Sequence, residues 1–456
     1  MSRTIIYNAE IVNEGSHRHG YVIIDGELIS KTGEGNPSAE ELAGADDCVD
    51  IEGRMLLPGA IDTHVHFREP GLTHKASMAT ESAAAVSGGI TSFIDMPNTR
   101  PATTSQGAVA DKKRIAAETS YANYGFFLGA TNDNLDEILA ADPHEIPGVK
   151  LFMGSSTGNM LVDDDITLSQ LFASYRGVIA VHAEDEATLA AARARLAALY
   201  GDDQPVWLHS QARPAEACFK ASQRAVKLAE KYGTRLHILH ISTARELSLL
   251  SPGEIGKKRI TAETCPHYLL FDETDLARDN GFMLKCNPAI KSATDRDALV
   301  KALSEGLIDT IATDHAPHLL EEKQGTLLKA ASGMPGVRFM LSEMLTLAAR
   351  DDNALTPERV VELTAHNPAR LYGIERRGFI RPGYYADLVV AERTAPFHPS
   401  VGEYLPAGLM SPCAWTPYAS TEVSYSIVST MVNGAVAFDG TRGRHTDVKP
   451  LRFNVG

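Results

Sequence analysis

The stretch GAIDTHVHFREPG, residues 59–71, is the most informative segment of the sequence. It continues an apolar run, MLLPGAI (55–61), that is typical of a buried strand. Side chains two residues apart point to the same face of an extended strand, so His64, His66 and Arg68 share one face. Two neutral imidazoles at a strand end are typical of half a metal site. The planar cation of Arg68 beside them would suit a substrate carboxylate.

Composition and charge restrict the class of protein. The chain has 456 residues, of which 44% are hydrophobic, and a formal net charge of −15. The acidic balance argues against nucleic-acid and anionic-membrane partners, so we expect neither. The cysteines are scattered and form no CxxC pair, which is typical of a reducing compartment without a disulfide framework. The first residues, MSRTIIYNAEIVNEG, lack the apolar core of a signal peptide, and no stretch reaches the length of a membrane span. We therefore expect a cytoplasmic protein.

Strand-like segments alternate with helical patterns between residues 58 and 377. The strand-like segments are GAIDTHVHF, TSFIDMPN, NYGFFLGAT, GVKLFMG, GVIAVHAED, RLHILHIST, RITAETCPHYLLF and DTIATDHAPH. This alternation favours an α/β fold, a (β/α)8 TIM-type barrel, over an open doubly wound sheet. No GxGxxG motif follows the first strand, which argues against dinucleotide binding.

Both ends of the chain are rich in strand and turn signals. Residues 1–57 and 378–456 each have too few strands to bury a core alone. We therefore predict a small β-sandwich domain that is built from both termini and flanks a barrel domain of residues 58–377.

Residues that can bind metal stand at the ends of five predicted barrel strands. They are His64, His66, Lys150, His182, His240 and Asp314. Each alone has an ordinary explanation, because a lone strand-end histidine is commonly a core residue and Asp314 could cap a helix. Together they predict a metal centre, since active sites of such barrels lie at the carboxyl ends of the strands. An ammonium at Lys150 would be repelled by two cations, whereas a lysine carbamylated by CO2 becomes an anion that could bridge them.

The motifs resemble those of the dihydroorotases, a branch of the cyclic amidohydrolases in the amidohydrolase superfamily. The matching segments are DTHVHFREPG (62–71), DMPNT (95–99) and ATDHAPHLLEEK (312–323), the last of which ends at Lys323. The resemblance runs over nearly the whole chain and implies a barrel with a small β-domain. It also implies zinc-dependent, reversible cyclisation of N-carbamoyl-L-aspartate to L-dihydroorotate in pyrimidine biosynthesis, and a homodimer.

The same resemblance implies a role for each site residue. His64, His66, carbamylated Lys150 and Asp314 would hold one zinc ion, and Lys150, His182 and His240 would hold the other. Asp314 would also be the catalytic acid and base. The substrate-binding residues would be Arg68, Asn98, Asn287 and His318. Two metal ions about 3.5–4 Å apart would activate the attacking water.

Two other functions stay open at this point. One is an allantoinase or a hydantoinase-like cyclic amidase. The other is a barrel that has lost catalysis and serves as a structural partner of another enzyme, although such proteins usually lack one or more ligands and all six are present here. We interpret His237, His267 and His315 as structural. The turn GMPG at 333–336 either shapes the pocket wall through its backbone or is an ordinary helix start.

Overall fold

Strands from the two ends of the chain share one mixed sheet in the computed structural model, which describes residues 2–154, 160–162, 164–350, 352, 354–402, 405–406 and 409–454. The strands are β1 (Arg3–Asn13), β2 (Ser16–Asp25), β3 (Leu28–Glu34), β4 (Asp47–Asp50), β5 (Met55–Pro58), β15 (Leu388–Phe397), β16 (Val423–Val432) and β17 (Ala435–Phe438). They pair in the order β17-β16-β15-β5-β1-β2-β3, and β4 pairs with β1. The antiparallel pairing of β5 with β15 joins the two ends of the chain.

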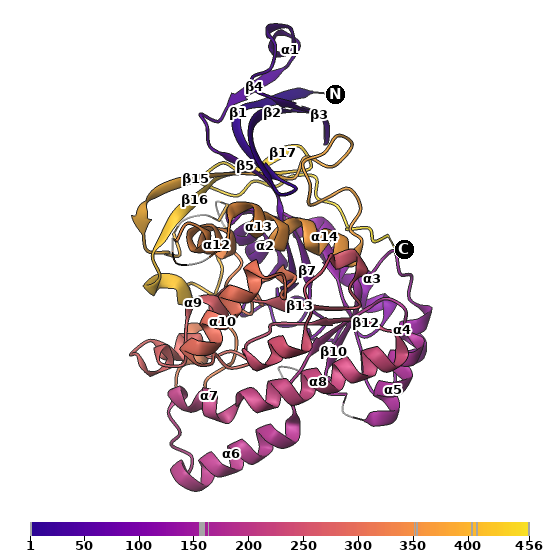
Figure 1. The fold of residues 1–456 in the computed structure, drawn as a ribbon, viewed down its shortest axis with the longest axis vertical. Coiled ribbons are helices and arrows are strands. Elements are labelled where there is room, and N and C mark those ends of the chain that lie inside the picture. The colour runs from indigo at the N-terminus through magenta and orange to yellow at the C-terminus, as the bar shows by residue number, and fades with distance from the viewer. Residues whose placement is uncertain are drawn as a thin grey trace.

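The arrangement of these strands can be compared with the predicted β-sandwich. Apolar side chains of β1, β2, β5 and β15, among them Ile11, Val22, Leu56 and Leu388, pack together on the sheet, which is strongly curved (Figure 1). Within the described ranges the strands of both ends are hydrogen-bonded into this single sheet rather than into two. The sandwich is therefore not confirmed, and the division into two domains stays a prediction.

The central strands are parallel to their neighbours throughout. One array contains β6 (Ala60–Val65), β7 (Ile90–Asp95) and β8 (Asn123–Phe126). The other contains β9 (Leu128–Gly129), β10 (Gly148–Phe152), β11 (Val178–His182), β12 (Arg235–Ile238), β13 (Ile260–Thr264) and β14 (Thr310–Ile311). The parallel α/β class is as predicted, but the strand pairing does not form one continuous ring. An isolated parallel bridge joins Val65 to His315, next to β14.

Helices follow most of the central strands and cover them (Figure 1). The helices of the described residues are α1 (Ala39–Ala43), α2 (Met78–Ser87), α3 (Gln106–Thr119), α4 (Leu135–Ala140), α5 (Asp165–Ser174), α6 (Glu186–Tyr200), α7 (His209–Ala212), α8 (Ala215–Tyr232), α9 (Pro266–Leu270), α10 (Ala293–Ser304), α11 (Leu320–Lys323), α12 (Met340–Ala348), α13 (Pro357–Val361) and α14 (Asn367–Tyr372). Several begin at serine caps, as at Ser77, Ser105 and Ser292, whose side chains accept backbone N–H groups of the first turn.

One predicted strand is wrong in its second half. The segment 259–271 was expected to be extended throughout, yet the strand ends at Thr264 and helix α9 begins at Pro266. Proline is favoured at the first helical position because its missing N–H is one that a helix start leaves unpaired anyway. The proline therefore marks the turn from β13 into the helix.

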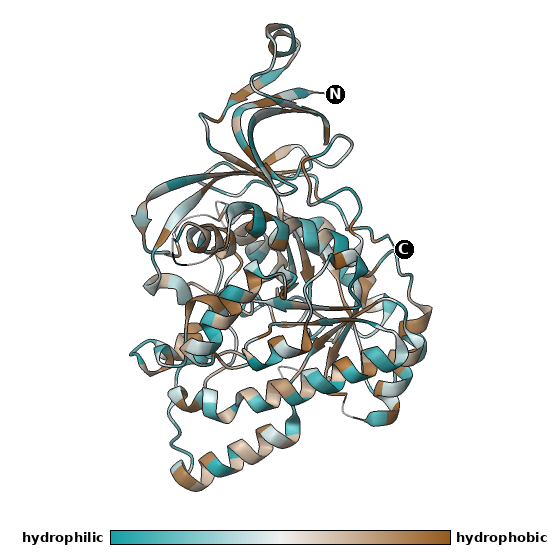
Figure 2. Cartoon of the chain, viewed as in Figure 1, coloured by the Kyte–Doolittle hydropathy of each residue, from teal (hydrophilic) through white to brown (hydrophobic). Residues whose placement is uncertain are grey.

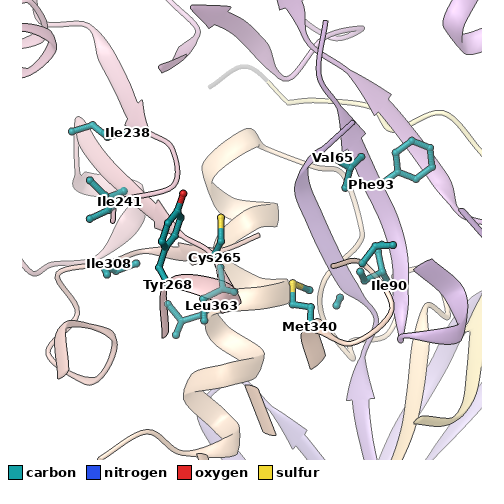
Figure 3. Close-up of a cluster of buried hydrophobic side chains, with 14 of the residues drawn as sticks. Val65, Ile90, Phe93, Ile238, Ile241, Cys265, Tyr268, Ile308, Met340 and Leu363 are labelled. Carbon is teal, nitrogen blue, oxygen red and sulfur yellow. The ribbon is translucent and has the colours of Figure 1, made fainter. Parts of the chain in front are cut away.

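The core lies between the parallel strands and the helices around them. Every residue of β10 and β11 is buried, as expected for parallel strands covered on both faces. Figure 3 shows part of the largest cluster, with Val65 and Phe93 from one array and Ile238 from the other. Met340 of α12 packs in the same cluster and ties the helical layer to the strands.

The helices are amphipathic rather than uniformly apolar. In α8, buried Ala217, Ala221, Ala225 and Ala229 recur every four residues, and hydrophilic residues alternate with them along the helix (Figure 2). This spacing puts the small side chains on the face that meets the core. Among the helices that the structure describes, none combines the length and the hydropathy that crossing a bilayer requires.

Candidate metal centre and carboxylate subsite

The predicted metal ligands meet in one cavity at the carboxyl ends of the parallel strands. The side chains that line it are His64, His66, Lys150, Phe152, His182, His240, Asn287, Asp314, Ala316, Ser332 and Gly333. The cavity therefore contains all six predicted ligands and Asn287, which come from segments far apart in the sequence. This is the end of the strands at which such folds place their active sites.

Three site residues have left-handed backbone conformations. The φ angles are +67° at Arg68, +41° at His240 and +47° at Asp314. A non-glycine residue in this region costs about 1–3 kcal/mol, and such residues concentrate at functional sites. Each of them lies two or three residues beyond a strand, since β6 ends at Val65, β12 at Ile238 and β14 at Ile311.

His64, His66 and Asp314 form the first group of donors. Asp314 Oδ1 lies 3.3 Å from His64 Nε2 and 3.0 Å from His66 Nε2, and this trio could hold a metal ion. Burial raises the pKa of the Asp314 carboxyl, but His64, His66 and His240 outweigh it and lower the pKa well below its ordinary value. Burial lowers the pKa of His66 to about 4. An ionised carboxylate and a neutral imidazole are the forms that bind metal.

His182, His240 and Lys150 form the second group. His182 Nδ1 lies 2.9 Å from His240 Nε2, and burial lowers the pKa of both imidazoles. Lys150 is buried, with its Nζ 4.6 Å from the centre of the Phe152 ring. In the described part of the chain this Nζ has neither a hydrogen-bond acceptor nor an ion-pair partner. Burial lowers the pKa of the Lys150 amine to about 7.

Two buried carboxylates, neither of which was predicted from the sequence, lie behind the histidines. Glu263 Oε1 lies 2.8 Å from His64 Nδ1, and Glu184 Oε2 lies 3.1 Å from His182 Nε2. Arg213 also lies 3.1 Å from Glu184. A carboxylate that hydrogen-bonds to the other ring nitrogen fixes the tautomer and the orientation of a metal-binding imidazole, and the contact between Glu263 and His64 is such a bond. Burial raises the pKa of Glu263, but the contacts with His64 and His237 together outweigh burial and lower this pKa to about 2.

Arg68 and His318 lie side by side next to the cavity. Arg68 Nη2 is 3.1 Å from His318 Nε2, and Arg68 Nε donates to the carbonyl of Pro317 at 3.0 Å. Burial lowers the pKa of Arg68 to about 10, so the guanidinium stays charged at neutral pH. Lys75, which the sequence analysis did not single out, brings its Nζ 3.1 Å from His318 Nδ1. Lys75 Nζ also lies 3.0 Å from Glu322 Oε1, so the Arg68 guanidinium and this lysine–glutamate pair both flank His318.

The two predicted asparagines contact the histidine shell. Asn98 Oδ1 lies 2.8 Å from His66 Nδ1, so the oxygen of the Asn98 side-chain amide, and not its nitrogen, faces that imidazole. Asn287 lines the cavity, and its Oδ1 lies 3.2 Å from His209 Nε2. His209 was not identified from the sequence, because it lies in the short helix α7 rather than at a strand end.

Of the three histidines that we interpreted as structural, His237 and His315 contact protein groups outside the cavity lining. His267 is buried, and neither of its ring nitrogens has a hydrogen-bond partner among the described residues. His237 Nδ1 lies 2.8 Å from Thr261 Oγ1, and His315 Nε2 lies 2.8 Å from Glu81 Oε2. The backbone N–H of Gly336 donates to His315 Nδ1 at 3.0 Å. Of the GMPG turn, Gly333 lines the cavity, whereas helix α12 begins only at Met340. The turn thus contributes backbone to the cavity wall.

Comparisons with known proteins point in one direction. A profile of the Amidohydrolase family matches residues 55–437. The chain is 37% identical to a dihydroorotase from Halobacterium salinarum over 387 residues, which are 84% of this chain and 86% of that protein. It is 34% identical to an allantoinase from Streptomyces avermitilis over 394 residues, 84% of each protein. Among solved structures, the L-hydantoinase (dihydropyrimidinase) from Arthrobacter aurescens superposes over the whole of both chains with a TM-score of 0.90 at 26% identity.

Proposed function

Because this chain belongs to the amidohydrolase family, we propose that it is a cyclic amidohydrolase with dihydroorotase activity. The reaction is the reversible cyclisation of N-carbamoyl-L-aspartate to L-dihydroorotate in the synthesis of UMP. The observation that carries the proposal is the buried guanidinium of Arg68 against His318, at the edge of a cavity with histidine and aspartate donors. Dihydroorotate has both groups that this arrangement would recognise, a cyclic amide and a carboxylate.

The alternative substrates lack one of these groups. The rings of allantoin and hydantoin contain the cyclic amide but have no carboxylate. A buried guanidinium pairs well with a carboxylate, and leaving it without an anion is costly. The combination of Arg68, Asn98 and His318 therefore favours dihydroorotate over the allantoinase reaction, although an allantoinase is among the similar proteins.

The donor set fits divalent zinc. Neutral imidazoles and a carboxylate are typical zinc ligands, and Nδ1 of His182 faces Nε2 of His240 in the cavity. We assign one zinc ion to His64, His66 and Asp314 and a second to His182 and His240. When bound, the metal ions would polarise the ring carbonyl and lower the pKa of water towards neutrality.

Lys150 is the proposed bridge between the two ion sites. Its amine nitrogen would attack CO2 and lose a proton, which leaves a carbamate with one negative charge. The burial of Lys150 without an anionic partner among the described residues supports this assignment, because a buried unpaired ammonium is unfavourable. A carbamate would supply two oxygen donors to a cavity in which Asp314 is the other anion.

The remaining site residues orient the substrate and move the proton. Arg68, Asn98 and His318 would hold the carboxylate, and Asn287 would approach the ring. In the ring-opening direction, Asp314 would accept the proton of the attacking water and return it to the leaving ring nitrogen. Its carboxylate is ionised and faces the cavity, as this role requires. Holding the distal carboxylate fixes the reacting carbonyl in place.

Three further assignments belong to this proposal. The two parallel arrays would be arcs of one (β/α)8 barrel, since Phe127 alone separates β8 from β9 and a bridge links Val65 to His315. The protein would act in the cytoplasm, on small molecules. It would form a homodimer, which sedimentation of the purified protein would test.

The direct test is an ultraviolet assay of dihydroorotate hydrolysis on purified protein, paired with metal content per chain. Parallel assays with allantoin and hydantoin complete it. Preference for dihydroorotate with two metal ions per chain supports the proposal. Faster turnover of allantoin, or protein that is active without metal, rejects it.

Arg68→Lys should weaken dihydroorotate much more than a ring without the carboxylate. An ammonium cannot reproduce the planar, bidentate pairing of a guanidinium. Losing one charge-assisted hydrogen bond costs about 1.5–3 kcal/mol, so the expected rise in KM is about ten- to a hundredfold. Hydantoin is the control substrate, because the metal ligands are unchanged. Equal losses on both substrates would mean that Arg68 supports the metal centre instead.

Glu263→Gln should lower the affinity for metal without unfolding the protein. Glutamine keeps the shape of Glu263 but removes the charge that orients His64. Changes of this kind cost about 10–100-fold in metal affinity. Glu246→Gln is a matched control, because Glu246 is equally buried but contacts the hydroxyls of Ser222 and Thr243. Zinc titration against a chelator measures both variants, and equal affinities for both would contradict the role of Glu263.

A further inference from the structure

Lys323 ends the sequence motif ATDHAPHLLEEK (312–323), and the proposed chemistry gives it no role. Its side chain is fully buried. Its Nζ donates to the carbonyls of Lys285 at 2.7 Å, Ala331 at 3.0 Å and Gly333 at 2.7 Å. Within the described ranges it has no carboxylate partner. A buried ammonium that spends all three donors on backbone carbonyls holds the segments that carry those carbonyls in fixed positions.

The segments that Lys323 joins form a wall of the cavity. Ser332 and Gly333 line the cavity that contains the metal ligands. The backbone N–H of Gly333 also donates to the carbonyl of Lys285 at 2.9 Å, so Lys323 and Gly333 meet at the same acceptor. Asn287, two residues beyond Lys285, lines the same cavity.

The wall also contacts the predicted carboxylate subsite. The carbonyl of Ser332 lies 3.1 Å from His318 Nε2, the nitrogen that faces Arg68. Trp415 Nε1 donates to the carbonyl of His318 at 2.8 Å, and the Lys323 ammonium lies 5.7 Å from the centre of the Trp415 ring. A shift of the wall would therefore move the His318 ring relative to Arg68.

We propose that Lys323 is a positioning residue that sets the Ser332–Gly333 wall and, through it, the placement of His318 in the carboxylate subsite. This inference rests on the proposed dihydroorotase function, since it names the part of that site which Lys323 serves. Lys323 touches neither the reacting atoms nor the metal ligands. Its loss should therefore act on carboxylate binding rather than on metal content.

The chain offers a matched control in Lys285. This second lysine is also buried and also binds carbonyls of the loop after α11, those of Leu327 and Ala330. These carbonyls lie outside the cavity lining. Lys285→Met removes a buried ammonium that binds this loop, while the backbone carbonyl of Lys285, which Lys323 binds, remains. Both variants should lose thermal stability, and only Lys323→Met should affect the subsite.

Steady-state kinetics of the zinc-loaded, full-length protein provide the first test. For Lys323→Met we expect the KM for dihydroorotate to rise about ten- to a hundredfold, the loss of one charge-assisted contact. The kcat should change little, the zinc content should stay the same, and hydantoin turnover should be unaffected. For Lys285→Met the KM should remain that of the wild type. An unchanged KM in Lys323→Met, or an equal rise in both variants, would overturn the proposal.

A second variant tests the role of the Ser332–Gly333 wall if Lys323→Met does not fold. Gly333→Ala displaces the wall directly, because a Cβ there would lie 2.8 Å from the Ala316 carbonyl oxygen and 3.2 Å from His318 Cδ2. It leaves both buried lysines intact. We expect the same rise in KM with unchanged zinc content, and a wild-type KM would reject the proposal.

Fluorescence separates failure of this inference from failure of the proposed function. The chain has two tryptophans, so Trp207→Phe leaves Trp415 as the only reporter of the wall. In that background, Lys323→Met should make Trp415 more accessible to acrylamide, and Lys285→Met should not. This readout needs no substrate. Wild-type protein that fails to hydrolyse dihydroorotate would reject the proposed function. Equal acrylamide quenching of the two lysine variants would instead reject the proposal that Lys323 positions the Ser332–Gly333 wall.

Discussion

Replacing Lys150 with alanine should remove metal and turnover together. The proposed carbamate is the only anion that both ion sites share, and Asp314 alone would remain to balance two divalent cations in the cavity. Metal activation contributes several kcal/mol to catalysis, so we expect a loss of turnover of about a thousandfold or more. Metal analysis and the dihydroorotate assay on the same preparation measure both effects.

Small acids and a matched lysine variant sharpen this experiment. Acetate or propionate should partly restore activity to Lys150→Ala by placing a carboxylate in the space that the side chain leaves. Lys285→Ala also removes a buried ammonium, but its partners are the carbonyls of Leu327 and Ala330. It should retain metal. Two metal ions per chain and normal turnover in Lys150→Ala would contradict the carbamate assignment.

Most of the metal ligands could be predicted because they stand at or near the point where a regular pattern ends. Lys150 was predicted at a strand end as well, but it lies in the middle of β10 (Gly148–Phe152). His64 and His66 follow the alternation of a strand, and His182, His240 and Asp314 each end or follow an apolar run. In parallel α/β folds the carboxyl ends of strands meet on one side, so chemistry at several strand ends implies one site. The cavity contains these side chains together.

The carboxylates behind the histidines follow no such pattern. Glu263 contacts His64 across 199 residues of sequence, and nothing local distinguishes it from other acidic residues near strand ends. Glu184 lies next to Asp185, which caps helix α6, and a cap is the usual explanation for an acid at that place. Their roles depend on which strands become neighbours, and the local periodicity of the sequence does not predict how distant strands pair.

Backbone contacts explain the other differences. The prediction of a strand over 259–271 was wrong after Thr264 because Pro266 occupies the first position of a helix. The role of Lys323 depends on three carbonyls, and a carbonyl is present at every residue, so no residue type signals it. Sequence patterns thus identify side chains that do chemistry more readily than the groups that hold them in place.

Replacing Asp314 with asparagine should leave a folded protein that turns over dihydroorotate about 10²–10⁴-fold more slowly, the usual contribution of a general acid and base. The amide has nearly the same shape as the carboxylate, so its packing against His64 and His66 can persist. It cannot take a proton from water, and it binds a cation more weakly than a carboxylate does. The loss of metal ligation should therefore add to the loss of proton transfer.

Asp309→Asn is the control for Asp314→Asn, because it changes a buried carboxylate just before the same strand. Asp309 pairs with Lys258, with Nζ–oxygen distances of 2.6 and 2.8 Å, at the end of β14 away from the cavity. That variant should lose stability but keep its turnover per folded chain. Circular dichroism, zinc content and initial rates over a range of zinc concentrations compare the two. If Asp314→Asn kept a near-normal rate at saturating zinc, another group would have to carry the proton. Among the described residues that line the cavity, the proposed Lys150 carbamate would be the only other anion. A deficit that persists with zinc fully bound would instead separate the two roles of Asp314, because ligation would then be restored while proton transfer would not.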